Sequence, residues 1–318
     1  MRIRAACCAA ALAACAADAG ASCGSAFCLV STDWTAQGIG VEPGFLFDLH
    51  YESIDQDQPR SGTHNVSVGE IPRHHDEVET KNRNLVASVD WYMAPAWGMQ
   101  VSIPYVDRDH LHIHNHQGEQ IPETWHFREL GDMRVLVRHE MFATRDDPAS
   151  IRSAGVTFGI KLPTGKFDVA NGEGEHAERT LQPGTGTTDL VLGGFWYSGN
   201  ALADCSLFAR AQVVLPLISR DDYKPGNQLS LDAGYRKNYG DVGLMLQVNY
   251  HVTGRDSGAN AEPDDSGKRQ LFVSPGISWN VARDTQLYAF AQLPLYQSVN
   301  GVQLTAKWSA LAGLSSRF

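Results

Sequence analysis

The chain has 318 residues, a formal net charge of −10 and a mean hydropathy of −0.26. Beyond its N-terminal region no run of 18 apolar residues occurs, which excludes a helical membrane protein because a membrane-spanning helix needs about 20 such residues. The acidic balance argues against a nucleic-acid partner, since such partners need basic surfaces.

The first residues have the form of a secretory signal peptide. Two arginines in the first four positions precede an apolar run over residues 5–17, and small residues follow at 19–21. This order predicts a signal peptide over residues 1–21 that is cleaved after its last residue. A second interpretation is a lipoprotein-processing box at residues 12–15, which would attach lipid to Cys15.

Residues 22–41 precede the first predicted strand and are expected to form a periplasmic N-terminal segment. Cys23 and Cys28 lie close together in it, and in an oxidising compartment we expect them to form a disulfide. Their spacing also suits a metal pair. Cys205 is then left as an unpaired thiol that is buried or faces lipid.

Residues 42–318 alternate between apolar and polar side chains. A strand with one face in lipid and one in a polar lumen requires this period of two. The fold class is therefore predicted as all-β, a transmembrane antiparallel up-and-down β-barrel of about 12 strands. The strands are expected near residues 45–51, 85–91, 99–105, 133–138, 156–162, 187–198, 207–215, 229–235, 242–250, 271–277, 287–295 and 302–318.

The connections between these strands alternate in length. Short ones are expected near residues 94–97, 144–150, 199–203, 238–241 and 282–284, and long ones near 55–80, 107–126, 164–186, 217–227 and 254–269. Short periplasmic turns and long outer loops are typical of bacterial outer-membrane barrels. The aromatic Phe318 on the lipid-facing phase resembles the C-terminal signature of these barrels. We therefore expect the bacterial outer membrane as the location, with the bilayer and the outer-membrane assembly machinery as partners.

The second phase of the strands is polar, which argues against a soluble β-sandwich or lipocalin-like barrel with an apolar interior. The residues predicted to line the lumen are Asp48, His50, Asp90, Arg134, Arg138, Lys161, Arg210 and Asp232. These charges either pair across the barrel and plug it, or line a narrow path. A barrel of twelve strands is intermediate between a filled barrel and an open porin.

Histidines gather in the first two expected outer loops. The candidate metal ligands are His74, His75, His110, His112, His114 and His116. The last four occupy alternate positions, so in an extended chain their imidazoles share one side. Imidazole with nearby carboxylate suits zinc or copper. No cofactor is required by this pattern, and solvated loop histidines are the alternative interpretation.

The sequence gives little support for a catalytic site. His139, Glu140 and Ser153 are candidates for a Ser-His-acid site at the rim, but their spacing does not single them out. Within residues 42–318 the chain has no Gly-x-Ser-x-Gly element and no Gly-x-x-x-x-Gly-Lys loop. We expect that the protein is not an enzyme.

A family resemblance appears in the middle of the chain. Leu-Pro-Thr-Gly-Lys at residues 162–166 and Gln-Pro-Gly-Thr-Gly at 182–186 face each other across one expected loop. This pairing resembles the outer-membrane proteins named for the meta-pathway of phenol degradation, over about 30 residues. The resemblance implies a transport-type barrel for small molecules, including aromatic ones.

The sequence therefore predicts an outer-membrane barrel that passes a small solute, either a hydrophobic or aromatic compound or a transition-metal ion, with histidine-rich outer loops that bind metal. One alternative is a barrel enzyme that acts on lipid or peptide at the outer rim. Another is a plugged barrel with a structural or adhesive role.

Overall fold

The computed structural model describes residues 26–38, 43–94, 96–116 and 118–318. The signal peptide predicted at residues 1–21 and Cys23 of the predicted disulfide lie outside the described residues, so both stay predictions. Within the described ranges the only helical element is the short 3-10 turn η1 (Pro263–Asp265). None of the described helical structure is long and apolar enough to cross a bilayer.

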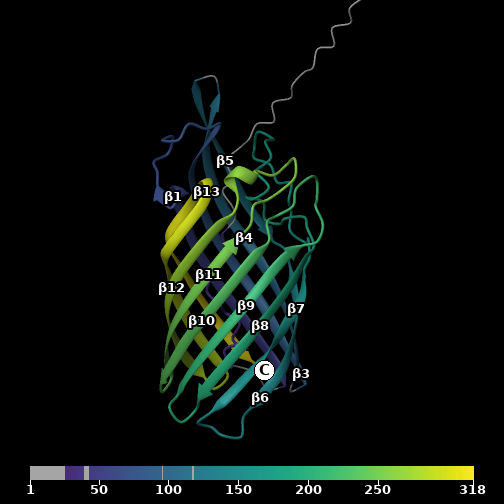
Figure 1. Ribbon diagram of the computed structural model, residues 1–318, viewed down its shortest axis with the longest axis vertical. Coiled ribbons are helices and arrows are strands. Elements are labelled where there is room, and N and C mark those ends of the chain that lie inside the picture. The colour runs from purple at the N-terminus through teal and green to yellow at the C-terminus, as the bar shows by residue number, and fades with distance from the viewer. Residues whose placement is uncertain (1–25, 39–42, 95, 117) are drawn as a thin grey trace, which may run out of the picture.

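Thirteen strands form one antiparallel sheet that closes into a barrel through the pairing of its first and last strands (Figure 1). The strands are β1 (Gly44–Gly62), β2 (His64–Asn65), β3 (His75–Ala94), β4 (Trp97–His116), β5 (Glu119–Leu130), β6 (Arg134–Thr144), β7 (Ile151–Lys161), β8 (Asp189–Asn200), β9 (Cys205–Pro216), β10 (Gln228–Tyr239), β11 (Val242–Thr253), β12 (Lys268–Ala282) and β13 (Thr285–Arg317).

The wall is crossed twelve times. The long strand β13 pairs with β12 over residues 285–299 and with β1 over 299–317, and it reverses direction around Gly301, whose φ is 53°. Strands β5 and β6 both pair with β4 and together make one interrupted crossing. The short β2 adds no crossing. The all-β barrel of about 12 strands predicted from the period-two pattern is thus confirmed.

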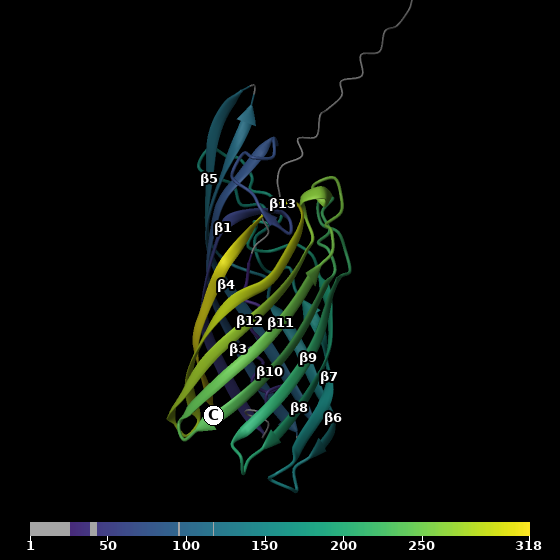
Figure 2. The same ribbon diagram turned by 60° about the vertical axis from the view of Figure 1, so that its left-hand side comes forward.

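The short turns lie where the sequence predicts them, but two of the five predicted long loops are mostly strand. Strands β1 and β3 continue through most of residues 55–80, and β4 and β5 continue through 107–126 as a hairpin that turns at Gly118. The hairpin projects well above the rest of the barrel (Figure 2). These segments resemble loops in sequence because both of their faces are polar.

The upper parts of β1, β3, β4 and β5 extend beyond the bilayer, and we call them the extensions. Their polar outer face marks the upper border of the lipid belt, the part of the barrel surface that contacts lipid. Tyr51, Leu85, Tyr105 and Leu130 form one cross-strand row of exposed apolar side chains on β1, β3, β4 and β5. Directly above this row the outward positions include charged side chains that pair with one another, as in the ion pair between Arg83 and Asp109. Charged side chains are too costly in hydrocarbon, so the extensions stand in water.

Below that border, hydrogen bonds between polar side chains stabilise the lumen-facing side of the wall. The amide of Asn249 donates to Asp232 at 2.8 Å and accepts from the hydroxyl of Ser274 at 2.8 Å. The amide of Gln292 then reaches Ser274 at 3.4 Å. All four side chains are buried. Buried polar groups must find partners, and here the partners lie on neighbouring strands, so the network ties the wall together from within.

Candidate functional site

Residues Ala26–Gly38 lie inside the barrel, so the prediction that residues 22–41 are periplasmic is wrong over this range. We call this range the plug segment. The amide of Leu29 donates to Gln292 at 3.2 Å, and Ser31 exchanges two bonds of 3.0 Å with the side chain of Gln247. The predicted position failed because the segment has no strand period and its partners are lumen side chains spread over the whole barrel.

Trp34 anchors the plug segment to the first strand. Its side chain is 1% exposed, its Nε1 donates to Asp48 at 2.8 Å, and its ring meets that of Tyr288 edge-on at 4.6 Å. Asp48 also accepts from the Tyr288 hydroxyl at 2.6 Å and from His50 Nδ1 at 2.8 Å. Two predicted lumen residues, Asp48 and His50, therefore belong to one buried network centred on Trp34.

Asp33 anchors the segment to two further strands. Its carboxylate lies 3.9 Å from Arg138 of β6 and 3.6 Å from Arg210 of β9. Arg138 also donates to Thr35 at 2.8 Å, and Arg210 lies 3.9 Å from Asp232. Arg138 and Arg210 thus both meet a carboxylate of the plug segment, and Arg210 also meets Asp232 of the neighbouring strand.

Of the predicted lumen residues that do not contact the plug segment, Asp90 has a hydrogen-bond partner in the wall. Asp90 is buried and accepts two bonds, of 3.0 and 3.1 Å, from the amide of Gln100. Arg134 begins β6 and is half-buried. Cys28 lies in the plug segment, and its thiol contacts the carbonyl of Ala310 at 3.7 Å.

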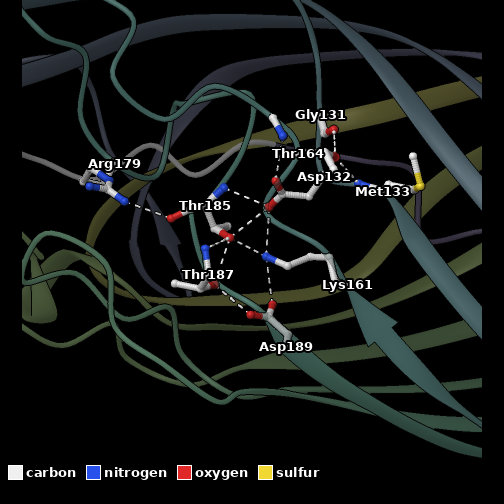
Figure 3. Close-up of polar contacts among 10 residues, drawn as sticks. Gly131, Asp132, Met133, Lys161, Thr164, Arg179, Thr185, Thr187 and Asp189 are labelled. Atoms are coloured by element: carbon white, nitrogen blue, oxygen red, sulfur yellow. Dashed lines mark hydrogen bonds and ion pairs between the residues drawn. The ribbon is translucent and has the colours of Figure 1, made fainter.

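Lys161 lies at the interruption between β5 and β6, in a cluster that we call the latch: Asp132, Lys161, Thr185, Thr187 and Asp189 (Figure 3). The lysine Nζ pairs with Asp132 at 3.0 Å and Asp189 at 2.9 Å and bonds the hydroxyl of Thr185. Asp132 also accepts the backbone amides of Gly165 and Thr185 at 3.1 and 2.9 Å. The latch therefore ties both ends of the third outer loop to the gap in the wall.

The latch explains why the family motifs carry glycine. A Cβ on Gly165 would lie 2.9 Å from backbone atoms of Gly131 and Gly184, and one on Gly184 would lie 2.6 Å from the Asp132 carboxylate. Real Cβ atoms do not approach that closely, so backbone must meet backbone here. The two motifs of residues 162–166 and 182–186 therefore build a structural contact.

The histidine cluster lies at the outer end of the barrel, on the inward face of the hairpin. Strand β4 places His110, His112 and His114 there, because its odd positions face outward, as Tyr105 does. Strand β3 adds His75, opposite His114. The ring nitrogens of His75 and His114 are 3.3 Å apart. The alternating histidines thus share one face, although in a strand rather than a loop.

Two carboxylates complete the cluster. Glu123 of β5 faces His112, and their side chains meet at 2.8 Å, while His114 lies 3.4 Å from the same carboxylate. Glu77 of β3 lies 3.6 Å from His110. Neither glutamate is among the ligands predicted from the sequence. The signal was available for Glu123, since a two-residue turn at Gly118 places it opposite His112.

Two predicted metal ligands stand at the edge of this cluster. The ring of His74 is 4.5 Å from that of His75 and 4.3 Å from that of His114. The ring of His116 is 5.9 Å from that of His114, and its side chain is exposed. His116 joins none of the metal-competent groupings found among the described residues.

The third outer loop covers the cluster from the lumen side. Trp125 packs on His112 with 4.7 Å between ring centres and donates to the carbonyl of Glu175 at 2.9 Å. This shelter, together with the adjoining rings of His112 and His74, lowers the pKa of His75 to about 4. Its imidazole is therefore neutral at pH 7.

A cavity of about 380 Å³ opens beside the end of the plug segment, lined by Gln37, Gly38, Tyr197 and residues of the short turns. It therefore lies at the periplasmic end of the lumen. Between this cavity and the outer mouth stand the side chains that contact the plug segment.

One solved structure shares this architecture. An outer-membrane channel from Pseudomonas putida F1 has a similar structure, with a TM-score of 0.64 at 10% identity over 91% of this chain and 99% of that one. The translocator domain of the autotransporter NalP from Neisseria meningitidis gives 0.43 at 10% identity over 87% and 89%. No curated protein shows significant sequence similarity to the chain.

The barrel, its lipid belt and its polar interior place the protein in the bacterial outer membrane. The family described as the putative MetA-pathway of phenol degradation matches residues 88–309, more than half of the chain. The chain belongs to that family of outer-membrane barrels.

Proposed function

We propose that the protein carries a small solute across the outer membrane through its lumen, and that passage requires the plug segment to move. The main support is the position of Ala26–Gly38, which makes hydrogen bonds or ion pairs with side chains of five strands around the lumen. A permanent structural plug needs no cavity beneath it. A gated path needs an opening at its periplasmic end, and the cavity beside Gly38 has that position.

The proposed solute is a small aromatic compound with a polar substituent, such as a phenol. The description of the family supports an aromatic solute. The interior supports a polar substituent, because the buried side chains of Gln247, Ser274 and Gln292 carry hydrogen-bond donors and acceptors on the inner side of three neighbouring strands. A transition-metal ion is the alternative solute, and the two are separated by direct uptake measurements with each.

Locking the plug segment in place should block transport. Cys28 lies against the hydroxyl of Ser309, so Ser309→Cys places a second thiol within reach of a disulfide. With Cys23 and Cys205 replaced by serine, oxidation by diamide should lower both single-channel conductance and uptake of hydroxybenzoate into proteoliposomes, and reduction should restore both.

The matched control carries Ser309→Cys together with Cys28→Ser, which has the same wall residue but cannot form the bond. Its transport should not respond to diamide. Undiminished passage through the fully cross-linked barrel would show that the segment does not gate the path. A barrel that is silent in every redox state, yet correctly folded, would favour the structural or enzymatic alternatives.

A further inference from the structure

From the histidine cluster we infer a binding site for one divalent transition-metal ion of the zinc class, held by His75, His112, His114 and Glu123. These four side chains come from three adjacent strands, β3, β4 and β5. The site stands above the lipid belt at the outer mouth. It is independent of the proposed transport, because binding requires only the folded hairpin and the loop that covers it.

The spacing of the donor atoms fits a tetrahedral ion. Zinc bonds of 2.0–2.1 Å at tetrahedral angles set the ligand atoms about 3.3 Å apart. Here His75 Nε2 and His114 Nδ1 are 3.3 Å apart, and His114 Nδ1 and Glu123 Oε1 are 3.4 Å apart. The donor atoms of His75, His112 and Glu123 all lie within 4.8 Å of one another. Small side-chain rotations therefore suffice to surround an ion.

Imidazole nitrogens in the cluster also lack other partners. His75 Nδ1, His112 Nδ1 and His114 Nε2 are buried and make no hydrogen bond to any residue that the structure describes. An unsatisfied buried polar atom destabilises the folded protein. These rings turn their other nitrogens, His75 Nε2, His112 Nε2 and His114 Nδ1, toward one another and toward Glu123, and those nitrogens are the donors available to an ion.

The donor set selects the class of ion. Three imidazoles and one carboxylate suit zinc, and no thiolate of the described chain is close enough to favour a softer ion. Calcium and magnesium prefer all-oxygen sites. His110 is not among the ligands, because its ring is fully buried and lies close to the Arg108 guanidinium, a cation that opposes a second one.

The test uses the full barrel refolded in detergent without a polyhistidine tag, with Zn²⁺ measured by calorimetry and Co²⁺ by its visible absorption. We expect one Zn²⁺ per barrel and the intense absorption of tetrahedral Co²⁺. His112→Ala and Glu123→Gln should each weaken binding by at least about tenfold, since even the outer partners of metal ligands are worth 10–100-fold.

Three control variants separate a built site from an adventitious one. His116→Ala removes a histidine of the same alternating run and Glu119→Gln a carboxylate of the same strand, and both residues are exposed. His126→Ala disrupts the group that this exposed histidine forms with the partly buried Asp107 and Asp109 on the outward face. All three should leave the Zn²⁺ affinity unchanged.

Equal losses of Zn²⁺ affinity in all five variants would indicate chelation by a solvated histidine tract and would overturn the proposal. A loss of affinity in His126→Ala alone, or no Zn²⁺ binding at all, would also overturn it. The heat-modifiable migration of each folded barrel on a gel checks that weak binding does not come from misfolding. Glu123→Gln, on the water-exposed hairpin, keeps the proposal testable if His112→Ala fails to fold.

Discussion

Replacing Asp33 and Trp34 together with alanine should release the plug segment and raise the conductance of the barrel several-fold. Asp33 is the carboxylate that faces Arg138 and Arg210, and Trp34 fills a buried site against Asp48 and Tyr288. Removing one partner of a buried ion pair costs about 3–5 kcal/mol, and truncating a buried tryptophan costs a similar amount.

These contacts hold a segment whose release leaves the wall intact. The free energy lost in the double variant therefore shifts the equilibrium between the plugged and the open state. A change of 1.4 kcal/mol shifts an equilibrium tenfold, so even a net loss of about 3 kcal/mol shifts it roughly a hundredfold. Single-channel recordings in planar bilayers measure this as longer or larger openings. Charge on Arg138 and Arg210, freed of Asp33, should also move selectivity toward anions.

The matched control is Thr32→Ala in the same segment, since the contact of Thr32 is a backbone bond from Trp34. Its conductance should equal that of the parent protein. If the double variant also conducts like the parent, the plug segment either stays bound without its two main anchors or does not obstruct the path. Either result would remove the basis for a gate.

The wall could be predicted from the sequence because it obeys one local rule. Side chains alternate between lipid and lumen, and Asp48, Arg138 and Arg210 were recognised as inward-facing from their phase alone. Their partner Asp33 could not be recognised in the same way. An inward charge can pair with any other inward charge, and the plug segment lacks a period that would place it among the strands.

The histidine cluster shows a similar limit. Alternation predicted that His110, His112 and His114 share a face, but the polar outer side of the hairpin disguised two strands as a loop. The partner Glu123 depends on the register, which a single turn at Gly118 sets for the whole hairpin. Residues within one strand are thus accessible to sequence reasoning, whereas contacts between strands require the turn to be placed first.

The latch should be the most sensitive point of the barrel to a single substitution. Lys161 is 5% exposed and neutralises both Asp132 and Asp189. Lys161→Met leaves two buried carboxylates without a cation, and we expect the free energy of unfolding to fall by about 3–5 kcal/mol. Urea unfolding of the refolded barrel, followed by tryptophan fluorescence, measures this loss.

Two variants test whether the cause is the unpaired charge. Lys166→Met removes a lysine of the same motif whose partner Glu129 is partly exposed, so it should cost less than about 1 kcal/mol. Adding Asp132→Asn and Asp189→Asn to Lys161→Met removes all three charges and should recover much of the loss, because replacing a whole buried ion cluster is far less costly than breaking it. A triple variant as unstable as Lys161→Met would instead assign the loss to the packing and hydrogen bonds that Asp132 makes with Gly165 and Thr185. The stability of the latch would then depend on its packing more than on its charges.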